Sequence, residues 1–248
     1  MSKVYACSDL HGRYDLYEAI CKMLQPEDKV YFLGDACDRG PDGWKLIKAI
    51  LQNEQWIYLR GNHEDMLIDA MRDYFHNDCC PVYRSYGLVV SNGGQETLEA
   101  AFADEFAKEW IRHLDRNLKM WEEYTNKNGI TIYMSHAGFT PNFYVDADGE
   151  PIFCPDAEKL TWDRHHFTDS WTGEEKEVCL HGHTPLVYLH RELFRKADAE
   201  VEPGTLWYCN NHKVCIDNLS AFTNIVCLLD LDTFDEHIIE VKENKNDY

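Results

Sequence analysis

Short apolar runs alternate with segments of helical periodicity along the first part of the chain. Apolar residues cluster at 3–8, 30–33 and 56–59, in runs whose length is typical of buried strands. Between these runs, residues 14–24 and 44–51 carry their apolar side chains at helical spacing. The order is therefore βαβαβ, which predicts parallel strands buried between helices.

Polar side chains follow these three strands at a regular interval. Asp9 and Asp35 are 26 residues apart, and Asp35 and Asn62 are 27 residues apart. Each interval corresponds to about one βαβ unit of roughly 30 residues. We therefore expect the three side chains to converge at the carboxyl edge of the sheet, where open α/β sheets bind their ligands.

The remainder of the chain predicts a helical insertion and a second sheet. The spacing after His63 is mainly helical, and we interpret residues 76–128 as a helical cap inserted between strands. The run at 130–134 returns to strand, whereas residues 142–176 are typical of long functional loops. Further strands are predicted at 178–181, 186–190, 205–209, 213–217, 224–230 and 236–242. Their close spacing favours antiparallel pairing, so that residues 1–248 form one domain of the α/β (α+β) class.

The acidic balance of the chain restricts its partners. Formal net charge is −20, with 44 Asp and Glu residues against 24 Lys and Arg residues. Broad nucleic-acid binding needs a basic surface, and anionic membranes attract basic segments, so we expect neither partner. A phosphate substrate is still allowed, because bound divalent cations can be the largest charges in a site.

No targeting or membrane segment is apparent in the sequence. The N-terminus passes directly into a strand without the apolar region of a signal peptide. No apolar run approaches the ~20 residues that a membrane helix needs. The ten cysteines are scattered without a CxxC pair, which favours reduced thiols. We therefore predict a cytoplasmic protein.

Five short segments place metal-seeking or phosphate-seeking side chains just after predicted strands. They are Ser8-Asp9-Leu10-His11-Gly12, Gly34-Asp35-Ala36-Cys37-Asp38-Arg39-Gly40, Leu59-Arg60-Gly61-Asn62-His63-Glu64, Ser135-His136-Ala137-Gly138 and His181-Gly182-His183-Thr184-Pro185. A single Asp after a strand more often caps a helix than binds a metal. An ordered series of carboxylate, imidazole and amide groups instead favours a metal site.

The ligand types suit a pair of divalent cations. Carboxylate, imidazole and amide ligands without thiolates suit Mn, Fe or Zn and argue against a structural zinc. A single carboxylate can bridge two cations, because it has about four lone-pair sites. Two ions about 3.5–4 Å apart can clamp an in-line displacement and generate hydroxide near neutral pH. We expect two divalent ions, with manganese ahead of iron, zinc or magnesium.

Two arginines and a histidine complete the predicted site. Arg39 and Arg60 have guanidinium groups that can bind phosphate oxygens through paired donors. His63 could protonate a departing oxygen, and Asp38 could hold its imidazole in the required tautomer. Arg164 is a possible third phosphate contact, although packing on Trp162 would explain it nearly as well.

These motifs closely resemble the calcineurin-like metallophosphoesterase superfamily, in particular its serine/threonine phosphoprotein phosphatase branch. The resemblance implies a two-sheet mixed β-sandwich flanked by helices. It implies that Asp9, His11 and Asp35 bind one metal, and that Asp35, Asn62, His136 and His183 bind the other. It also assigns Arg39, Arg60 and Asn62 to phosphate, and His63 with Asp38 to general-acid catalysis. Arg164 loosely matches a substrate-contacting arginine of the bacteriophage lambda phosphatase.

Departures from the family pattern bear on the substrate. Pro185 stands where many members end the last motif in a second histidine, which favours the phosphoprotein phosphatase branch. Symmetric diadenosine tetraphosphatases usually lack the acid at Asp38 and often have Asp in place of Glu64. We therefore expect a phosphomonoesterase acting on phosphorylated Ser or Thr, and also on Tyr as a further substrate. The alternatives are a symmetric diadenosine tetraphosphate hydrolase on the same metals and a phospho-binding module with an inactive site.

Overall fold

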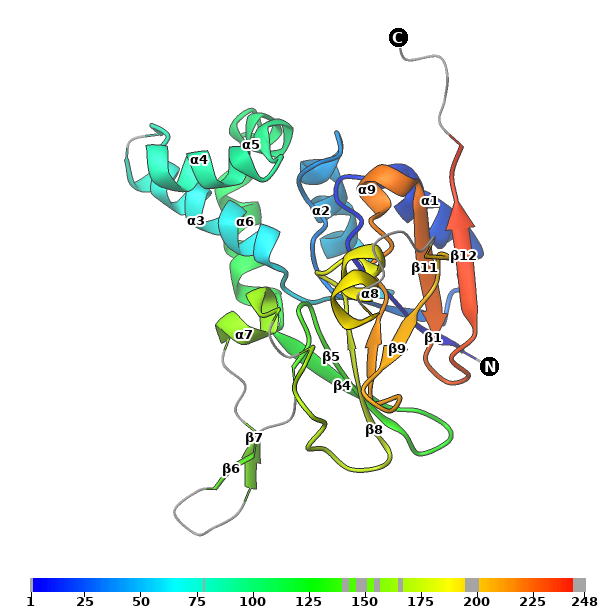
Figure 1. Cartoon of the computed structure of the whole chain (residues 1–248). Coiled ribbons are helices and arrows are strands. Elements are labelled where there is room, and N and C mark those ends of the chain that lie inside the picture. The colour runs from blue at the N-terminus through cyan, green and yellow to red at the C-terminus, as the bar shows by residue number, and fades with distance from the viewer. Residues whose placement is uncertain are drawn as a thin grey trace.

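The computed structural model describes residues 2–77, 79–139, 143–145, 151–153, 157–164, 167–194 and 201–242. Within these ranges, residues 143–145, 151–153, 157–158 and 194 are described by their backbone alone. The helices and strands form two packed sheets with helices around them (Figure 1).

The first sheet contains the three parallel strands that the βαβαβ pattern predicts. Its order is β12-β11-β1-β2-β3. The strands are β1 (Val4–Cys7), β2 (Lys29–Phe32), β3 (Trp56–Tyr58), β11 (Ile225–Asp230) and β12 (Glu236–Glu240). Strands β1, β2 and β3 run parallel, with Tyr5 opposite Val30, whereas β11 pairs antiparallel with β1 and β12.

The second sheet has the order β4-β5-β8-β10-β9. Its strands are β4 (Trp121–Thr125), β5 (Thr131–Ser135), β8 (Glu177–His181), β9 (Leu206–Tyr208) and β10 (Lys213–Cys215). The three central strands are parallel, and the two edge strands pair antiparallel. A separate two-stranded sheet joins β6 (Phe143–Val145) and β7 (Pro151–Phe153).

The two five-stranded sheets share one apolar core. Side chains from both sheets form a single buried cluster that includes Ala6, Leu229, Met134, Leu180 and Val214. Because alternate residues of a strand face opposite sides, Ala6 faces the second sheet while Tyr5 and Cys7 face the helices. The predicted two-sheet sandwich flanked by helices is confirmed.

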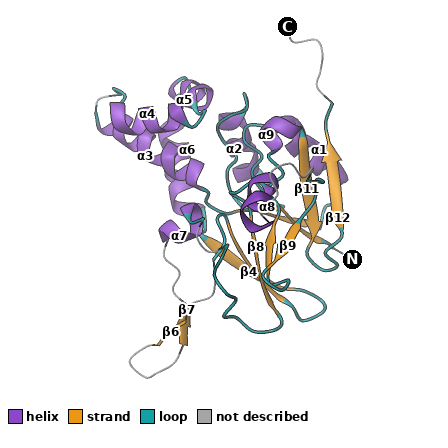
Figure 2. Cartoon of the chain, in the orientation of Figure 1, coloured by secondary structure: helices purple, strands orange, loops and turns teal. Residues whose placement is uncertain are grey.

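Helices cover the outer faces of both sheets (Figure 2). Helices α1 (Tyr14–Met23) and α2 (Gly43–Gln52) pack on the first sheet, and α8 (Leu186–Phe194) packs on the second. The insertion after β3 comprises α3 (Asn62–His76), α4 (Tyr83–Ser91), α5 (Gln95–Phe102) and α6 (Ala107–Asn117). Two short helices, α7 (Ala157–Trp162) and α9 (Ser220–Thr223), lie in connections. No helix within the described ranges is long and apolar enough to span a bilayer.

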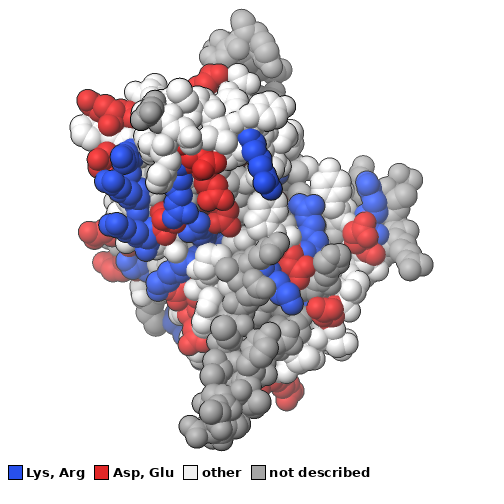
Figure 3. Space-filling view, turned by 90° about the vertical axis from the view of Figure 1, so that its left-hand side faces the viewer, with Lys and Arg blue, Asp and Glu red and all other residues white. Residues whose placement is uncertain are grey.

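The insertion carries acidic and basic side chains together. Figure 3 shows the face on which α3 and α4 lie, with Lys and Arg among Asp and Glu. The ion pairs Arg72–Asp69 at 3.7 Å and Arg60–Asp115 at 3.2 Å belong to these helices and their surroundings.

The structure corrects several of the predicted elements. Residues 186–190 were predicted as a strand, but they form the beginning of α8. The first turn of this helix comes directly after Pro185, and Leu186 and Leu189 are buried at helical spacing. The helical cap predicted for residues 76–128 ends earlier, at Asn117. Residues 121–125 of the predicted cap instead form β4, which belongs to the second sheet because it pairs with β5. Strands β11 and β12 pair antiparallel as predicted but extend the first sheet, whereas β8 and β10 pair parallel, which contradicts the prediction.

The segment 142–176 is also more regular than the predicted loops. It contains β6, β7 and α7, and β8 begins immediately after it. Residues 142, 146–150, 154–156 and 165–166 of this segment lie outside the described residues.

One buried carboxylate fixes the ends of β2 and β3 relative to each other. Glu64 accepts hydrogen bonds of 2.8 Å from the backbone N–H groups of Asp35, Ala36 and Gly61, and from the hydroxyl of Tyr58. Because Glu64 is fully buried, water does not compete for these donors. Glu64 thereby holds the loop that carries Asp35 against the first turn of α3.

We predict that Glu64→Gln destabilises the protein by about 2–3 kcal/mol, because an amide N–H₂ then faces backbone N–H donors that lose a charged acceptor. Urea unfolding followed by circular dichroism measures the change. Glu18→Gln, at an exposed position of α1, is the matched control and should be close to neutral. Equal stability of the two variants would contradict the role of Glu64.

Candidate functional site

The predicted ligands converge at the carboxyl ends of parallel strands from both sheets. Asp9 and His11 follow β1, Asp35 follows β2, and Asn62 begins α3 after β3. His136 follows β5 and His183 follows β8, so the second sheet contributes two imidazoles. We call these six residues the ligand cluster: Asp9, His11, Asp35, Asn62, His136 and His183.

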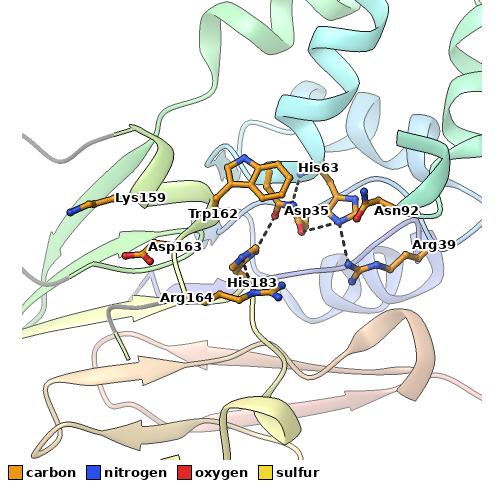
Figure 4. Close-up of a pocket in the computed structure, with 10 residues that line it drawn as sticks. Asp35, Arg39, His63, Asn92, Lys159, Trp162, Asp163, Arg164 and His183 are labelled. Carbon is orange, nitrogen blue, oxygen red and sulfur yellow. Dashed lines mark hydrogen bonds and ion pairs between the residues drawn. The ribbon is translucent and has the colours of Figure 1, made fainter. Parts of the chain in front are cut away.

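Asp35 lies at the centre of the ligand cluster. Its Oδ2 is 3.3 Å from Nε2 of His136, 3.6 Å from Nε2 of His11 and 3.8 Å from Nε2 of His63. Figure 4 shows Asp35 between His63 and His183. Because imidazole nitrogens lie on several sides of Oδ2 of Asp35, this oxygen lies where a ligand that bridges two metal ions is required.

Asn62 and His183 occupy the side of the cluster that faces the second sheet. The Oδ1 atom of Asn62 is 3.0 Å from Nε2 of His136 and 3.0 Å from Nδ1 of His183. On the other side, Nε2 of His11 is 3.9 Å from Oδ1 of Asp9. Two groups of donor atoms therefore share Asp35, as the predicted pair of metals requires.

Backbone carbonyls orient two of the imidazoles. Nδ1 of His11 lies 2.8 Å from the carbonyl of Cys37, and Nδ1 of His136 lies 2.7 Å from the carbonyl of Leu33. Since a carbonyl oxygen only accepts, each Nδ1 carries the proton and donates it. The lone pair of each Nε2 is then directed toward the cluster, as in metal-binding histidines.

The backbone at the site adopts a conformation that side chains other than glycine seldom take. Six non-glycine residues have positive φ angles of 43–68°: Asp9, His11, Asp35, Asp38, Arg39 and His183. A left-handed non-glycine residue costs about 1–3 kcal/mol, and such residues concentrate at functional sites. Four of the six ligands are therefore held in strained backbone, although seven non-glycine residues outside the motifs, within the described ranges, also have positive φ angles.

The donor atoms fit divalent cations. Oδ1 of Asp9 is buried and has no hydrogen-bond partner within the described part of the chain. The donor sets His11–Asp35–His63 and Asp35–His136–His183 each lie within 4.8 Å. Burial alone would lower the pKa of His136, but the carboxylates of Asp35 and Asp9 raise it to about 10. The same carboxylates favour a bound cation, which would replace the proton on Nε2 of His136, and the oxygen and nitrogen donors suit divalent metals.

His63 and Asp38 form a buried acid–base pair beside the cluster. Nδ1 of His63 is 2.6 Å from Oδ2 of Asp38, and both side chains are buried. Burial would lower the pKa of His63, but the charge of Asp35 and the hydrogen bond to Asp38 outweigh it and raise the pKa. A raised pKa favours the protonated imidazole that a general acid requires.

The two arginines closest to the cluster lie beside different ligands. Arg39 approaches Nε2 of His11 at 2.6 Å and Nε2 of His63 at 3.2 Å. Arg164 donates from Nε to Nε2 of His183 at 3.3 Å. Both line a cavity of about 740 Å³ that opens at the cluster (Figure 4).

Arg60, by contrast, does not reach this cavity. It forms ion pairs with Asp65 and with Asp115, the latter at 3.2 Å, and it lines a separate cavity with Met66 and Met120. Its proposed role in phosphate binding is a prediction that this geometry does not support, because two carboxylates already engage the guanidinium.

Several residues near the site were not assigned from sequence. Asn92, Lys159, Trp162 and Asp163 line the cavity with the predicted residues. Asp217 follows β10 and is buried, and burial together with the charge of Asp9 raises its pKa. Its position after a strand of the second sheet is the pattern that identified His136 and His183, so the same rule would have found it.

The family of the chain is established by comparison with known sequences. A family model for calcineurin-like phosphoesterases matches residues 2–187, which is more than half of the chain. The chain belongs to this family, and it is a metallophosphoesterase, an enzyme class that hydrolyses phosphate esters.

Three curated relatives differ in their named substrates. An asymmetrical bis(5'-nucleosyl)-tetraphosphatase of Oceanobacillus iheyensis is 25% identical over 90% of this chain and 86% of that protein. A symmetrical bis(5'-nucleosyl)-tetraphosphatase of Buchnera aphidicola is 30% identical over 58% of this chain, spanning about half (47%) of that protein. Serine/threonine-protein phosphatase 1 of Salmonella typhimurium is 33% identical over 27% of this chain and 32% of that protein.

Solved structures share the fold at low sequence identity. A yeast protein serine/threonine phosphatase has a TM-score of 0.60 at 13% identity, covering 99% of this chain and 82% of that chain. A crystal structure described as a putative diadenosine tetraphosphatase has a TM-score of 0.56 at 14% identity, covering 97% and 94%. At these identities the similarity establishes the fold alone.

We predict that Asp35→Asn weakens Mn²⁺ binding at least about tenfold, because one ligand of both donor sets loses its charge. Calorimetric titration of the metal-free protein measures the affinity, and the rise in melting temperature on adding Mn²⁺ gives an independent readout. Asp69→Asn, at an exposed position of α3, is the control. Unchanged Mn²⁺ affinity in the Asp35 variant would remove Asp35 from the metal site.

Proposed function

We propose that the protein is a metal-dependent hydrolase of dinucleoside polyphosphates such as diadenosine tetraphosphate. The observation that supports this proposal best is the placement of Arg39 and Arg164 beside different ligands of the cluster, Arg39 at His11 and Arg164 at His183. Both guanidinium groups can bind phosphate oxygens, and together they would supply charged donors at two places along a chain of phosphates that crosses the cluster.

The named activities of the relatives support the same substrate class. The relative that matches along most of both chains is named as a bis(5'-nucleosyl)-tetraphosphatase, and so is the relative from Buchnera aphidicola. The sequence patterns at Asp38, Glu64 and Pro185 favoured a phosphoprotein phosphatase, but we give the named activities of the relatives more weight. The hydrogen bonds that Glu64 accepts from the backbone have a structural role in this fold that does not depend on the substrate.

The residues of the site have separable roles in this proposal. Asp9, His11, Asp35, Asn62, His136 and His183 would hold two divalent cations, which supply Lewis acidity and a water of lowered pKa. Arg39 and Arg164 would hold phosphate oxygens through charged hydrogen bonds. His63, kept in one tautomer by Asp38, would donate a proton to the departing oxygen.

We predict that the purified protein, supplied with Mn²⁺, hydrolyses diadenosine tetraphosphate with a kcat/KM at least about tenfold above that for a phosphoserine peptide. The expectation follows from the two arginines, which bind a polyphosphate at more points than a monoester. Chromatography of the nucleotide products measures the rate and distinguishes symmetrical from asymmetrical cleavage. A higher kcat/KM for the phosphopeptide would contradict the proposal.

A phosphoprotein phosphatase is the second candidate, and the His63–Asp38 pair favours it. A serine alkoxide is a poor leaving group and depends on protonation, whereas a departing nucleotide phosphate depends on it less. The pair, with its 2.6 Å contact and raised histidine pKa, supplies this proton. The local similarity to serine/threonine-protein phosphatase 1 supports the same candidate.

We predict that His63→Asn lowers kcat for a phosphoserine peptide by about 100-fold and lowers kcat for p-nitrophenyl phosphate much less, because p-nitrophenolate departs without a proton. Steady-state kinetics on both substrates measures the difference. Mn²⁺ affinity should stay within about twofold of the wild type, and His113→Asn on the exposed face of α6 is the control. Loss of metal binding would instead make His63 a ligand, as its distance from Asp35 also allows.

A further inference from the structure

A second cavity adjoins the ligand cluster on the side of α8 and α9. It has a volume of about 670 Å³ and shares Arg39, Arg164 and His183 with the cavity at the cluster. We call it the α8–α9 cavity. Its remaining lining comes mainly from apolar and aromatic side chains between residues 167 and 222. Of the five motifs, only the last contributes residues to this part of the lining.

Three aromatic side chains give the α8–α9 cavity its character. Phe167 is buried, stacks on His181 with ring centroids 5.8 Å apart, and contacts Tyr208 edge-on. Tyr188 on α8 and Phe222 on α9 are 50% and 69% exposed. One aromatic is therefore fixed in the wall, and two others present ring surface to solvent at the cavity. Exposed rings around a concave site are typical of pockets for flat ligands.

The polar groups of the cavity differ from those of the cluster. Arg39 and Arg164 provide positive charge where the two cavities meet. Glu192, four residues after Tyr188 on α8, adds a carboxylate to the lining. A carboxylate repels a phosphate but accepts hydrogen bonds from sugar hydroxyls or an amino group. The charges thus suit a ligand that is anionic at the arginines and neutral and hydroxylated beyond them.

Thr184 supplies an independent indication of a ligand. It lines the α8–α9 cavity, and its buried Oγ1 has no hydrogen-bond partner among the described residues. A buried hydroxyl without a partner is costly, and a bound polar group would satisfy it. The residue directly follows His183, so this hydroxyl lies next to the cluster.

We propose that the α8–α9 cavity binds the nucleoside of a nucleotide whose phosphates lie at Arg39 and Arg164, with its base against Phe222 and Tyr188. This inference rests on the proposed function and adds to it the place where one nucleoside of the substrate binds. An apolar side chain of a phosphopeptide is the other occupant to consider, but it would leave the buried hydroxyl of Thr184 without a polar partner.

The first test compares substrates with and without nucleosides. Phe222→Ala should lower kcat/KM for diadenosine tetraphosphate about tenfold, because stacking on one aromatic side chain is lost. Hydrolysis of inorganic tetraphosphate, which has the phosphates but no base, should be unchanged. Phe222 is mostly exposed, so its removal should leave folding intact, and Phe106→Ala, at a 57% exposed site by α6, is the matched control. An equal loss on both substrates, or no loss, would overturn the inference.

The second test measures binding without turnover. Calorimetry with AMP in the presence of Mn²⁺ should show binding that Phe222→Ala and Tyr188→Ala each weaken about tenfold and Phe106→Ala does not. Wild-type protein that fails to bind AMP, or variants that bind it normally, would overturn the inference whatever the activity. Phe222-dependent AMP binding by a protein that does not hydrolyse diadenosine tetraphosphate would overturn the proposed function alone. Stronger competition by a phosphopeptide with a bulky apolar residue than by AMP would assign the cavity to peptide.

Discussion

The convergence of buried carboxylates at one edge of two sheets is the constraint on which this structure depends. Asp9, Asp35, Glu64 and Asp217 are all buried, and each follows or adjoins the end of a strand. Burial raises the pKa values of Asp9, Glu64 and Asp217, and neighbouring carboxylates raise them further. Negative charge concentrated in the interior is unfavourable unless cations compensate it. Metal binding therefore contributes to the stability of the fold as well as to its chemistry.

The same edge is held in a strained backbone by its surroundings. Left-handed conformations at the ligand residues are maintained by hydrogen bonds between successive loops, such as His11 N–H to the carbonyl of Asp35 at 2.9 Å. Gly182 lies so close to Ser8 and Asp9 that a methyl group there would clash with both side chains. Glu64 ties the loop after β2 to the start of α3. Rigid packing of loops is what keeps ligands from five distant segments in register.

The sequence predicted the part of this site that follows from strand order. Asp9, Asp35 and Asn62 recur at the interval of a βαβ unit, and parallel strands bring such positions together whatever the details of the helices. Arg60 occupies a comparable position in its motif, yet its side chain is engaged by Asp65 and by Asp115, which is 55 residues away. A partner that distant is set by how α6 packs against α3, and local spacing carries no information about it.

The hydrophobic pattern predicted the wrong secondary structure where tertiary packing decides between helix and strand. Residues 186–190 are apolar enough for a strand, but the chain turns into α8 after Pro185 and closes the outer face of the second sheet. This difference also matters for function, because α8 brings Tyr188 and Glu192 to the cavity beside the cluster. A strand in its place would have put Leu186 and Leu189 on opposite faces, whereas the helix buries both.

The contrast between the two cavities bears on how the substrate is chosen. The ligand cluster can act on any phosphate ester, so it does not select between a phosphoprotein and a dinucleotide. Selection must come from groups that contact the rest of the substrate, and in the proposed nucleoside site these would be the arginines shared by both cavities and the aromatic residues beyond them. A protein with a net charge of −20 repels polyanions at long range. Affinity for a polyphosphate therefore requires local positive charge, which bound cations, Arg39 and Arg164 would concentrate at the one point where the two cavities meet.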